Sequence, residues 1–303
     1  MNATSEPRPR IHQHSSLETR VRVKKVALEG PGVIIMTGPS SCGKGEVASA
    51  LSKVLSLEGD SQVSMGHLLR TTVKRAQEEP DFRRYLAQEH DLGDVSIFES
   101  KDTSPELVAK VRSYVPEMEA HFHRTGMAER TTQLEWLEFC TLHGLLVPNR
   151  WTTEFIGAYL NQTPKVQHEP FILDGYPRTV GAAEHLLHCL DKARIPIIRV
   201  LHLSISKQEM MARAGIRGRV DDDPASLLSR YNFYIESVQP SVDYLKVALG
   251  ARLISLIDAH QPVFDDDGSF NLPASINNVV YSALRALGVP RVIVVDLLNL
   301  GKR

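Results

Sequence analysis

The chain has 303 residues, of which 42% are hydrophobic and 23% are charged, and its formal net charge is −1. These values are typical of a globular protein with a hydrophobic core, and the near-zero charge predicts no overall attraction to nucleic acid or to an anionic membrane. Three cysteines are too few for a disulfide framework and no apolar stretch is long enough to cross a bilayer, so we expect a cytoplasmic protein.

The N-terminal region contains a polar segment followed by a nucleotide-binding motif. Residues 1–21 are rich in Ser, Pro, Arg and His and are predicted to form a flexible tail. The apolar run 33–37 is a predicted strand and 45–56 a predicted helix, with the pattern Gly-x-x-x-x-Gly-Lys between them. Strand, glycine loop and helix in this order form a P-loop, whose backbone N–H groups hold the phosphates of a nucleoside triphosphate such as ATP. The predicted ATP-binding residues are Gly38, Pro39, Ser40, Ser41, Cys42, Gly43, Lys44, Gly45 and Glu46.

A largely helical segment follows. A short strand is predicted at 62–65, and helical patterns cover 81–90, 104–124 with a break at Pro116, and 128–143. We therefore expect a helical insertion over 66–165, between the second and third strands.

The third predicted strand, 170–173, leads into a second informative motif. It ends at Asp174, and an acid at the carboxyl end of a buried strand in a P-loop protein lies where Mg²⁺ and its waters are held. Arg178, in the next loop, would project into the same crevice and offer a bidentate donor for phosphate. An ordinary strand exit, with Asp-Gly and Pro as turn formers, is the alternative interpretation. The preceding P-loop favours the functional one.

The rest of the chain completes an alternating pattern. Strands are predicted at 197–203 and 252–257, and helices at 182–193, 207–214 and 224–249, the last with a kink or an end near Pro240. Strands that alternate with helices indicate an α/β fold with a doubly wound, five-stranded parallel sheet, and ligands then bind at the carboxyl ends of the strands.

Five stretches of the sequence together resemble the adenylate kinase-like nucleoside monophosphate kinases. They follow the order of that family, and several motifs in order are more specific than any one of them. Asp-Gly-Tyr-Pro-Arg (174–178) is similar to the family signature. The other stretches are the P-loop 38–45, the segments 65–70 and 144–148, and 218–222 followed by Arg230.

The resemblance implies a role for each matching residue. Lys44 would contact the β- and γ-phosphates of ATP, and Asp174 would order Mg²⁺ through water. Arg70 and Arg178 would hold the phosphate of the acceptor. The residues that would close over the transferring group are Arg219 and Arg230, with Arg213 or Arg217.

The resemblance also implies a division of the chain. The core would comprise 22–65, 166–210 and 223–288, the monophosphate-binding region 66–165, and a short LID 211–222. The span between Arg70 and Gly144 is roughly twice as long as the family requires. It forms either a larger or different acceptor pocket, or helices that only pack or associate. The extension 289–303 contains an apolar run that forms either an edge strand or an association surface.

Four departures from the family pattern bear on the substrate. Ala182 stands where members that accept AMP have a glutamine, and a methyl group cannot read an adenine edge. His67 replaces an acidic residue and Glu46 replaces a threonine. The short LID requires that closure come partly from elsewhere.

These observations predict an ATP- and Mg²⁺-dependent phosphotransferase. Its acceptor would bear a phosphate and would be a nucleoside monophosphate other than AMP. The alternatives are a P-loop kinase with a hydroxyl acceptor, against which Arg70 and Arg178 argue, and a low-turnover nucleotide-binding regulatory module, for which Glu46 and the short LID argue. Expected partners are a nucleotide and a phosphorylated small molecule, with no nucleic acid or membrane and with an undetermined oligomeric state.

Overall fold

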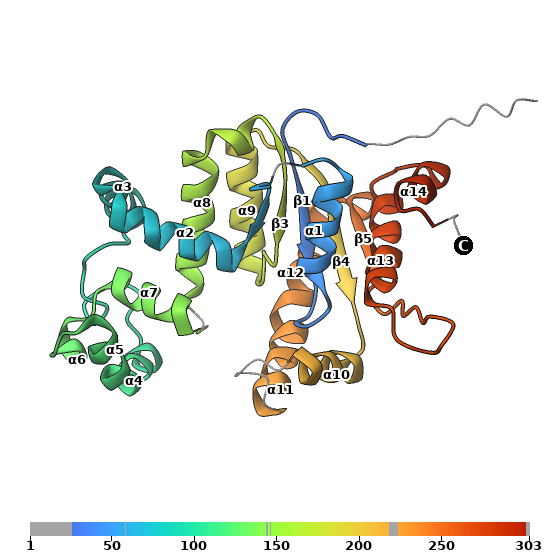
Figure 1. Ribbon diagram of the computed structural model, residues 1–303. Coiled ribbons are helices and arrows are strands. Elements are labelled where there is room, and N and C mark those ends of the chain that lie inside the picture. The colour runs from blue at the N-terminus through green and yellow to red at the C-terminus, as the bar shows by residue number, and fades with distance from the viewer. Residues whose placement is uncertain (1–25, 58, 144, 146, 218–223, 301–303) are drawn as a thin grey trace, which may run out of the picture.

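The computed structural model describes residues 26–57, 59–143, 145, 147–217 and 224–300 (Figure 1). Five parallel strands form one sheet in the order β2-β3-β1-β4-β5. The predicted tail, 1–21, and residues 218–222 of the predicted LID lie outside the described residues. The strands are β1 (Gly32–Thr37), β2 (Gln62–Ser64), β3 (Pro170–Asp174), β4 (Ile197–Ser204) and β5 (Ile254–Asp258). The predicted fold class, a five-stranded doubly wound α/β sheet, is confirmed.

Helices cover both faces of the sheet because the central strands are apolar on both sides. Ile34 and Met36 pack with Leu51 under α1 (Lys44–Val54), α13 (Leu272–Ala286) and α14 (Arg291–Leu297). Val33 and Ile35 belong to the core on the opposite face, under α8 (Asn149–Gln162), α9 (Val180–Lys192) and α12 (Gln239–Leu249). Burial on both faces is the pattern expected for parallel strands.

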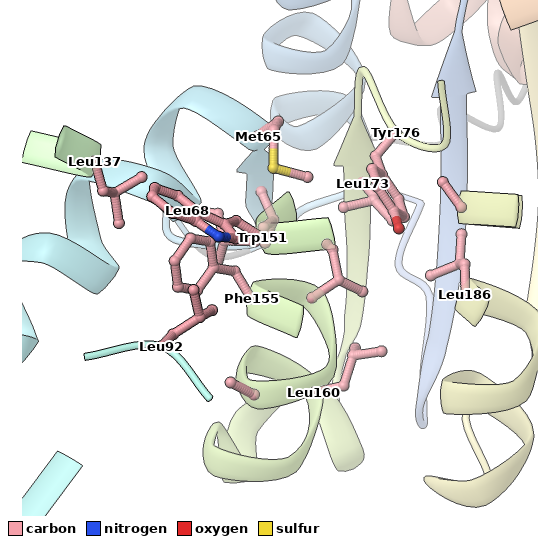
Figure 2. Close-up of a cluster of buried hydrophobic side chains, with 14 of the residues drawn as sticks. Met65, Leu68, Leu92, Leu137, Trp151, Phe155, Leu160, Leu173, Tyr176 and Leu186 are labelled. Atoms are coloured by element: carbon pink, nitrogen blue, oxygen red, sulfur yellow. The ribbon is translucent and has the colours of Figure 1, made fainter. Parts of the chain in front are cut away.

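The insertion forms a helical arm on the α8–α9 side of the sheet, to the left in Figure 1. Hydrophobic packing joins this arm to the sheet without a break. Figure 2 shows Trp151 and Phe155 of α8 lying between Leu137 of α7 and Leu173 of β3. The helices of the arm are α2 (Met65–Glu78), α3 (Pro80–His90), α4 (Pro105–Ser113), α5 (Val115–Phe122), α6 (Met127–Arg130) and α7 (Gln133–His143).

A polar cluster fixes the loop between α3 and α4. The side chain of Asp102 is only 5% exposed and accepts hydrogen bonds from Arg150 Nε and Nη2 at 2.5 Å and from Trp151 Nε1 at 2.7 Å. Burial acts to raise the pKa of Asp102, but the donors Arg150 and Trp151 lower it below its usual value. The carboxylate therefore ties the loop to the start of α8.

The C-terminal half of the chain contains two deviations from the predicted elements. The predicted helix 224–249 is α11 (Pro224–Phe233), a π-helical turn (Tyr234–Val238) and α12, and α10 (Lys207–Arg217) precedes it. The π-turn lies directly before Pro240, whose ring would otherwise clash with a carbonyl one turn earlier. The apolar extension is the helix α14 and not an edge strand, because Pro290 leads into a helical turn and Val294 is buried in the cluster beneath α13.

Candidate functional site

The phosphate loop begins where β1 ends, and its backbone requires glycine at the first position. Gly38 has φ +145°, and a Cβ atom there would lie 2.4 Å from the carbonyl oxygen of Leu203 on β4. Gly43 has φ +85° and lies directly before α1. The loop therefore packs against the neighbouring strand β4 and leads directly into the amino end of α1. The free N–H groups of this helix end favour binding of an anion.

Lys44 is held over this loop. Its ammonium group donates hydrogen bonds to the carbonyl oxygens of Gly38 at 2.9 Å and Pro39 at 2.7 Å. The Sγ atom of Cys42 lies 3.6 Å away. The first turn of the helix also carries Glu46, which is exposed. One positive charge therefore lies at the centre of the loop, with one negative charge at its margin.

Asp174 ends β3 and faces the same loop. Its Oδ1 atom is buried and has no hydrogen-bond partner among the described residues. Its Oδ2 atom is 4.0 Å from the Cβ position of Gly45. Burial raises the pKa of Asp174, the charges of Lys44 and Arg178 oppose that rise, and Glu46 adds to it. The structure therefore brings Lys44, Asp174 and Arg178 together, as the sequence predicted.

The two arginines predicted to hold the acceptor lie on adjacent elements. Arg178 is exposed in the loop after β3, and its Nε donates to the carbonyl oxygen of Gly175 at 2.8 Å. Arg70 is exposed on α2, which starts directly after β2. Because β2 and β3 pair in parallel, both arginines leave the same edge of the sheet.

Two of the remaining predicted arginines, Arg213 and Arg230, lie on α10 and α11, which follow β4 in the chain. Arg213 of α10 donates from Nε to Glu209 at 2.6 Å and from Nη2 to the carbonyl oxygen of Ala259 at 3.0 Å. Arg230 is half-buried on α11. Arg217 ends α10, but its side chain is outside the described set, and Arg219 lies entirely outside the described residues.

Two further positions at which the sequence departs from the family pattern, Ala182 and His67, lie at the starts of helices. Ala182 is buried, and its N–H donates to Thr179, which caps α9. His67 is exposed on the first turn of α2, and its N–H donates to the capping residue Ser64. These placements leave a methyl group and an imidazole near the predicted acceptor region, where an amide and a carboxylate were expected.

A buried polar bridge behind the loop was not predicted. His202 of β4 lies between Thr37, with Oγ1 at 2.6 Å from Nδ1, and Tyr234, whose hydroxyl is 2.9 Å from Nε2. Burial, aided by the charge of Lys44, lowers the pKa of His202 to about 4. The one available signal was a histidine between the apolar residues Leu201 and Leu203 of a predicted strand.

The arm contains a cavity of about 410 Å³. Val73, Ala76 and Leu134 form apolar parts of its wall, and the pairs Arg83–Asp94 and Arg124–Glu135 border it. None of the phosphate-handling residues named above is among its lining. The cavity is therefore separate from the phosphate site.

Comparison with known proteins gives matches to adenylate kinases. A family model described as "Adenylate kinase" matches residues 101–249. An adenylate kinase of Mycolicibacterium smegmatis is 30% identical over 145 residues, which are 48% of this chain and 69% of that protein. One of Mycolicibacterium paratuberculosis is 25% identical over 214 residues, 70% of this chain and 85% of that protein.

Two further matches are more limited. An adenylate kinase of Mycobacterium tuberculosis is 34% identical over 103 residues, 34% of this chain, and the match spans 56% of that protein. A crystal structure of a gluconokinase from Sinorhizobium meliloti 1021 aligns with a TM-score of 0.41 at 14% identity, covering 86% of this chain and 94% of that chain. Among the described residues, no helix is long and apolar enough to cross a membrane.

Proposed function

This chain belongs to the adenylate kinase family, and on that premise we propose that it transfers the γ-phosphoryl group of ATP to a phosphate-bearing acceptor, a nucleoside monophosphate other than AMP. The observation that carries the proposal is the cluster of Lys44, Asp174 and Arg178 at the carboxyl edge of a parallel sheet, beside a glycine loop that opens a helix. Ligands bind at this edge in open α/β sheets.

The chemistry of the cluster suits phosphoryl transfer. This reaction passes through a loose transition state, so a catalyst acts by aligning the two substrates and by supplying positive charge. In the proposal Lys44 binds the outer phosphates of ATP, and Arg70 and Arg178 hold the acceptor phosphate in line with them. Arg213 and Arg230, with Arg217 and Arg219, bind the nucleotide and the transferring group. Each arginine presents a rigid fork that matches phosphate oxygens.

The residues present also fit Mg²⁺. Oδ1 of Asp174 is buried and has no partner among the described residues, and Oδ2 of the same carboxylate lies 4.0 Å from the Cβ position of Gly45 in the loop. No three His, Cys, Asp or Glu side chains in the described part of the chain gather around a metal position. A hard cation held by one carboxylate, water and substrate phosphates suits such a site. When bound, Mg²⁺ would neutralise charge on the phosphates, and Asp174 would orient its waters.

The acceptor is inferred from what the site lacks. Adenine is read through hydrogen bonds to its polar edge, and the buried methyl group of Ala182 offers none. The backbone N–H of Ala182 is already used by Thr179. A base other than adenine, held by groups of the arm, is consistent with both facts. We therefore assign acceptor binding to 66–165 and closure to 211–222, on a core of 22–65, 166–210 and 223–288.

We further propose a cytoplasmic location. Cys42, Cys140 and Cys189 are all unpaired, and two of them are buried. Free buried thiols are typical of a reducing compartment.

The test is ADP release from ATP and Mg²⁺ with AMP, CMP, UMP, GMP or dTMP supplied singly. We expect turnover with one monophosphate other than AMP, abolished by Lys44→Ala and lowered at least a hundredfold by Arg178→Ala. The matched controls are Lys53→Ala, at the far end of α1, and Arg252→Ala, ahead of β5 at the opposite edge of the sheet. Both should retain turnover.

Each outcome identifies a different function. Activity with AMP would contradict the inference from Ala182. ATP binding without turnover on any monophosphate would favour the regulatory module. Turnover with a hydroxyl compound, insensitive to Arg178→Ala, would identify the other kinase class.

A further inference from the structure

The buried bridge behind the phosphate loop links two elements that bind phosphate in the proposed function. Thr37 is the last residue of β1, and the loop starts at the next residue. Thr37 and His202 are register partners on adjacent parallel strands. Their side chains therefore project from the same face of the sheet, which brings Oγ1 within 2.6 Å of Nδ1.

The other end of the bridge is on the π-turn. Tyr234 opens this turn, and its ring lies nearly parallel to that of His202, with centroids 5.9 Å apart and planes inclined by 8°. Arg230 precedes Tyr234 by four residues on the helix that leads into the turn. Residues four apart lie on one face of a helix, so the position of Tyr234 sets that of Arg230.

The environment makes this bridge rigid. Thr37 is 1%, His202 5% and Tyr234 8% exposed, and His202 is the one buried histidine among the described residues. A neutral imidazole has one donor and one acceptor, and each hydroxyl can take the complementary role. Every polar atom of the bridge is then paired inside a low-dielectric core, where an unpaired group is costly.

The bridge also adjoins the tightest contact of the loop. Leu203, the next residue of β4, is the one whose carbonyl oxygen excludes any side chain at Gly38. Residues 202 and 203 thus fix the start of the loop from two directions: His202 holds Thr37 on one face of the sheet, and Leu203 meets Gly38.

We propose that His202 is a positioning residue, which through Thr37 and Tyr234 fixes the phosphate loop relative to the helix that carries Arg230, so that both bind the same polyphosphate. The inference rests on the proposed function, because it takes Arg230 as a phosphate ligand. It assigns His202 no contact with substrate.

The test measures affinity for MgATP by calorimetry, which needs no acceptor. His202→Phe keeps a ring of similar size and removes both hydrogen bonds, and we expect about tenfold weaker binding. Arg230→Ala should weaken binding about tenfold in the wild type and only about twofold in the His202→Phe background, because the arginine is no longer positioned there. A residue that only stabilised the fold would leave the effect of Arg230→Ala unchanged.

Partial variants keep the test valid if His202→Phe does not fold. Thr37→Val and Tyr234→Phe each remove one hydrogen bond, and their effects on affinity should be less than additive when combined. His202→Asn and His202→Gln place an amide near the former Nδ1 and Nε2 positions respectively, and each should recover part of the loss.

The failures are distinguishable. A wild-type protein that does not bind MgATP would contradict the proposed function. Binding that His202→Phe leaves intact, or an Arg230→Ala effect that is equal in both backgrounds, would overturn the role of His202 alone. Unchanged affinity in Arg230→Ala would also overturn the role of His202. It would not contradict the proposed phosphotransferase function, which does not depend on Arg230 alone.

Discussion

At the scale of one residue, Asp174, the proposed magnesium ligand, is a buried carboxyl group that destabilises the folded protein when it is ionised. Its pKa is raised above 3.8 by burial, so the folded state binds its proton more tightly than the unfolded chain does. The stability that this carboxyl contributes is present at low pH and is lost as the pH rises through its folded pKa. At neutral pH the ionised group is therefore unfavourable, and a bound cation would relieve it.

We expect Asp174→Asn to stabilise the ligand-free protein at pH 7 by about 1 kcal/mol while lowering Mg²⁺-dependent turnover at least tenfold. Urea denaturation and a kinase assay give the two values. Asp258→Asn is the matched control, because Asp258 is the last residue of β5 and is exposed. A destabilised Asp174→Asn variant would contradict the assignment of buried charge.

His202 has the opposite dependence on pH. Its pKa falls from 6.5 to about 4 on folding, so the unfolded chain binds the proton more readily and stability decreases as the pH drops through that window. Between pH 7.5 and pH 5 this should remove about 2 kcal/mol from the free energy of unfolding. Denaturant titrations of the wild type and of His202→Gln at both pH values test this. The variant should lose less stability on acidification, and equal losses would contradict the prediction.

Among the elements, the loop between α3 and α4 is fixed by charge as well as by packing. Asp102→Ala would leave Arg150 and Trp151 Nε1 without their buried acceptor, and we expect a loss of about 3 kcal/mol. Asp94→Ala is the matched change, since the Arg83–Asp94 pair is exposed at 44% and 59% and should lose less than about 1 kcal/mol. Free energies of unfolding from urea titration distinguish the two. Similar losses of stability for Asp102→Ala and Asp94→Ala would contradict the prediction that burial makes the Asp102 interactions more stabilising.

The strands were predictable because local and tertiary preferences agree in them. Val33, Ile34, Ile35 and Met36 are apolar and buried on both faces, so the run itself indicates a central strand. The apolar extension was ambiguous because β-branched residues such as Val292 and Val294 favour strands locally, whereas packing beneath α13 selects a helix. Helices α2 and α8 were predicted only as parts of the helical insertion 66–165, without bounds of their own, and α13 was not predicted.

The candidate site likewise contains residues that were predictable from the sequence and residues that were not. The loop, Asp174 and Arg178 follow from contiguous motifs, and the structure gathers their side chains. The bridge of His202 does not follow from a contiguous motif, because Tyr234 is 32 residues away in the sequence and contacts His202 from the π-turn. A single histidine in an apolar run carries no spacing signal, so its partners depend on tertiary contacts.

At the scale of the whole molecule, one continuous hydrophobic core joins the arm to the face of the sheet that it covers. The same cluster contains Trp136 of α7, Trp151 of α8 and Val33 of β1, all fully buried. We therefore expect arm and sheet to unfold together. Single-tryptophan variants Trp136→Phe and Trp151→Phe, each monitored by the fluorescence of the remaining tryptophan in urea, should give transitions that match circular dichroism of the same variant. An earlier fluorescence transition for Trp136 would show that the arm unfolds alone.

The pairing of β2 with β3 has a consequence for how such proteins diversify. Ser64 and Asp174 are partners in the ladder, so the chain leaves the sheet after β2 and returns through β3, its immediate neighbour, whatever the length between them. For flexible chain, each doubling of a closed loop adds only about 0.6 kcal/mol of entropic cost. Residues can therefore accumulate between these two strands while the phosphate loop and Asp174 keep their places. If the arm binds the acceptor as proposed, such insertions would change the range of acceptors and leave the chemistry of phosphoryl transfer as it is.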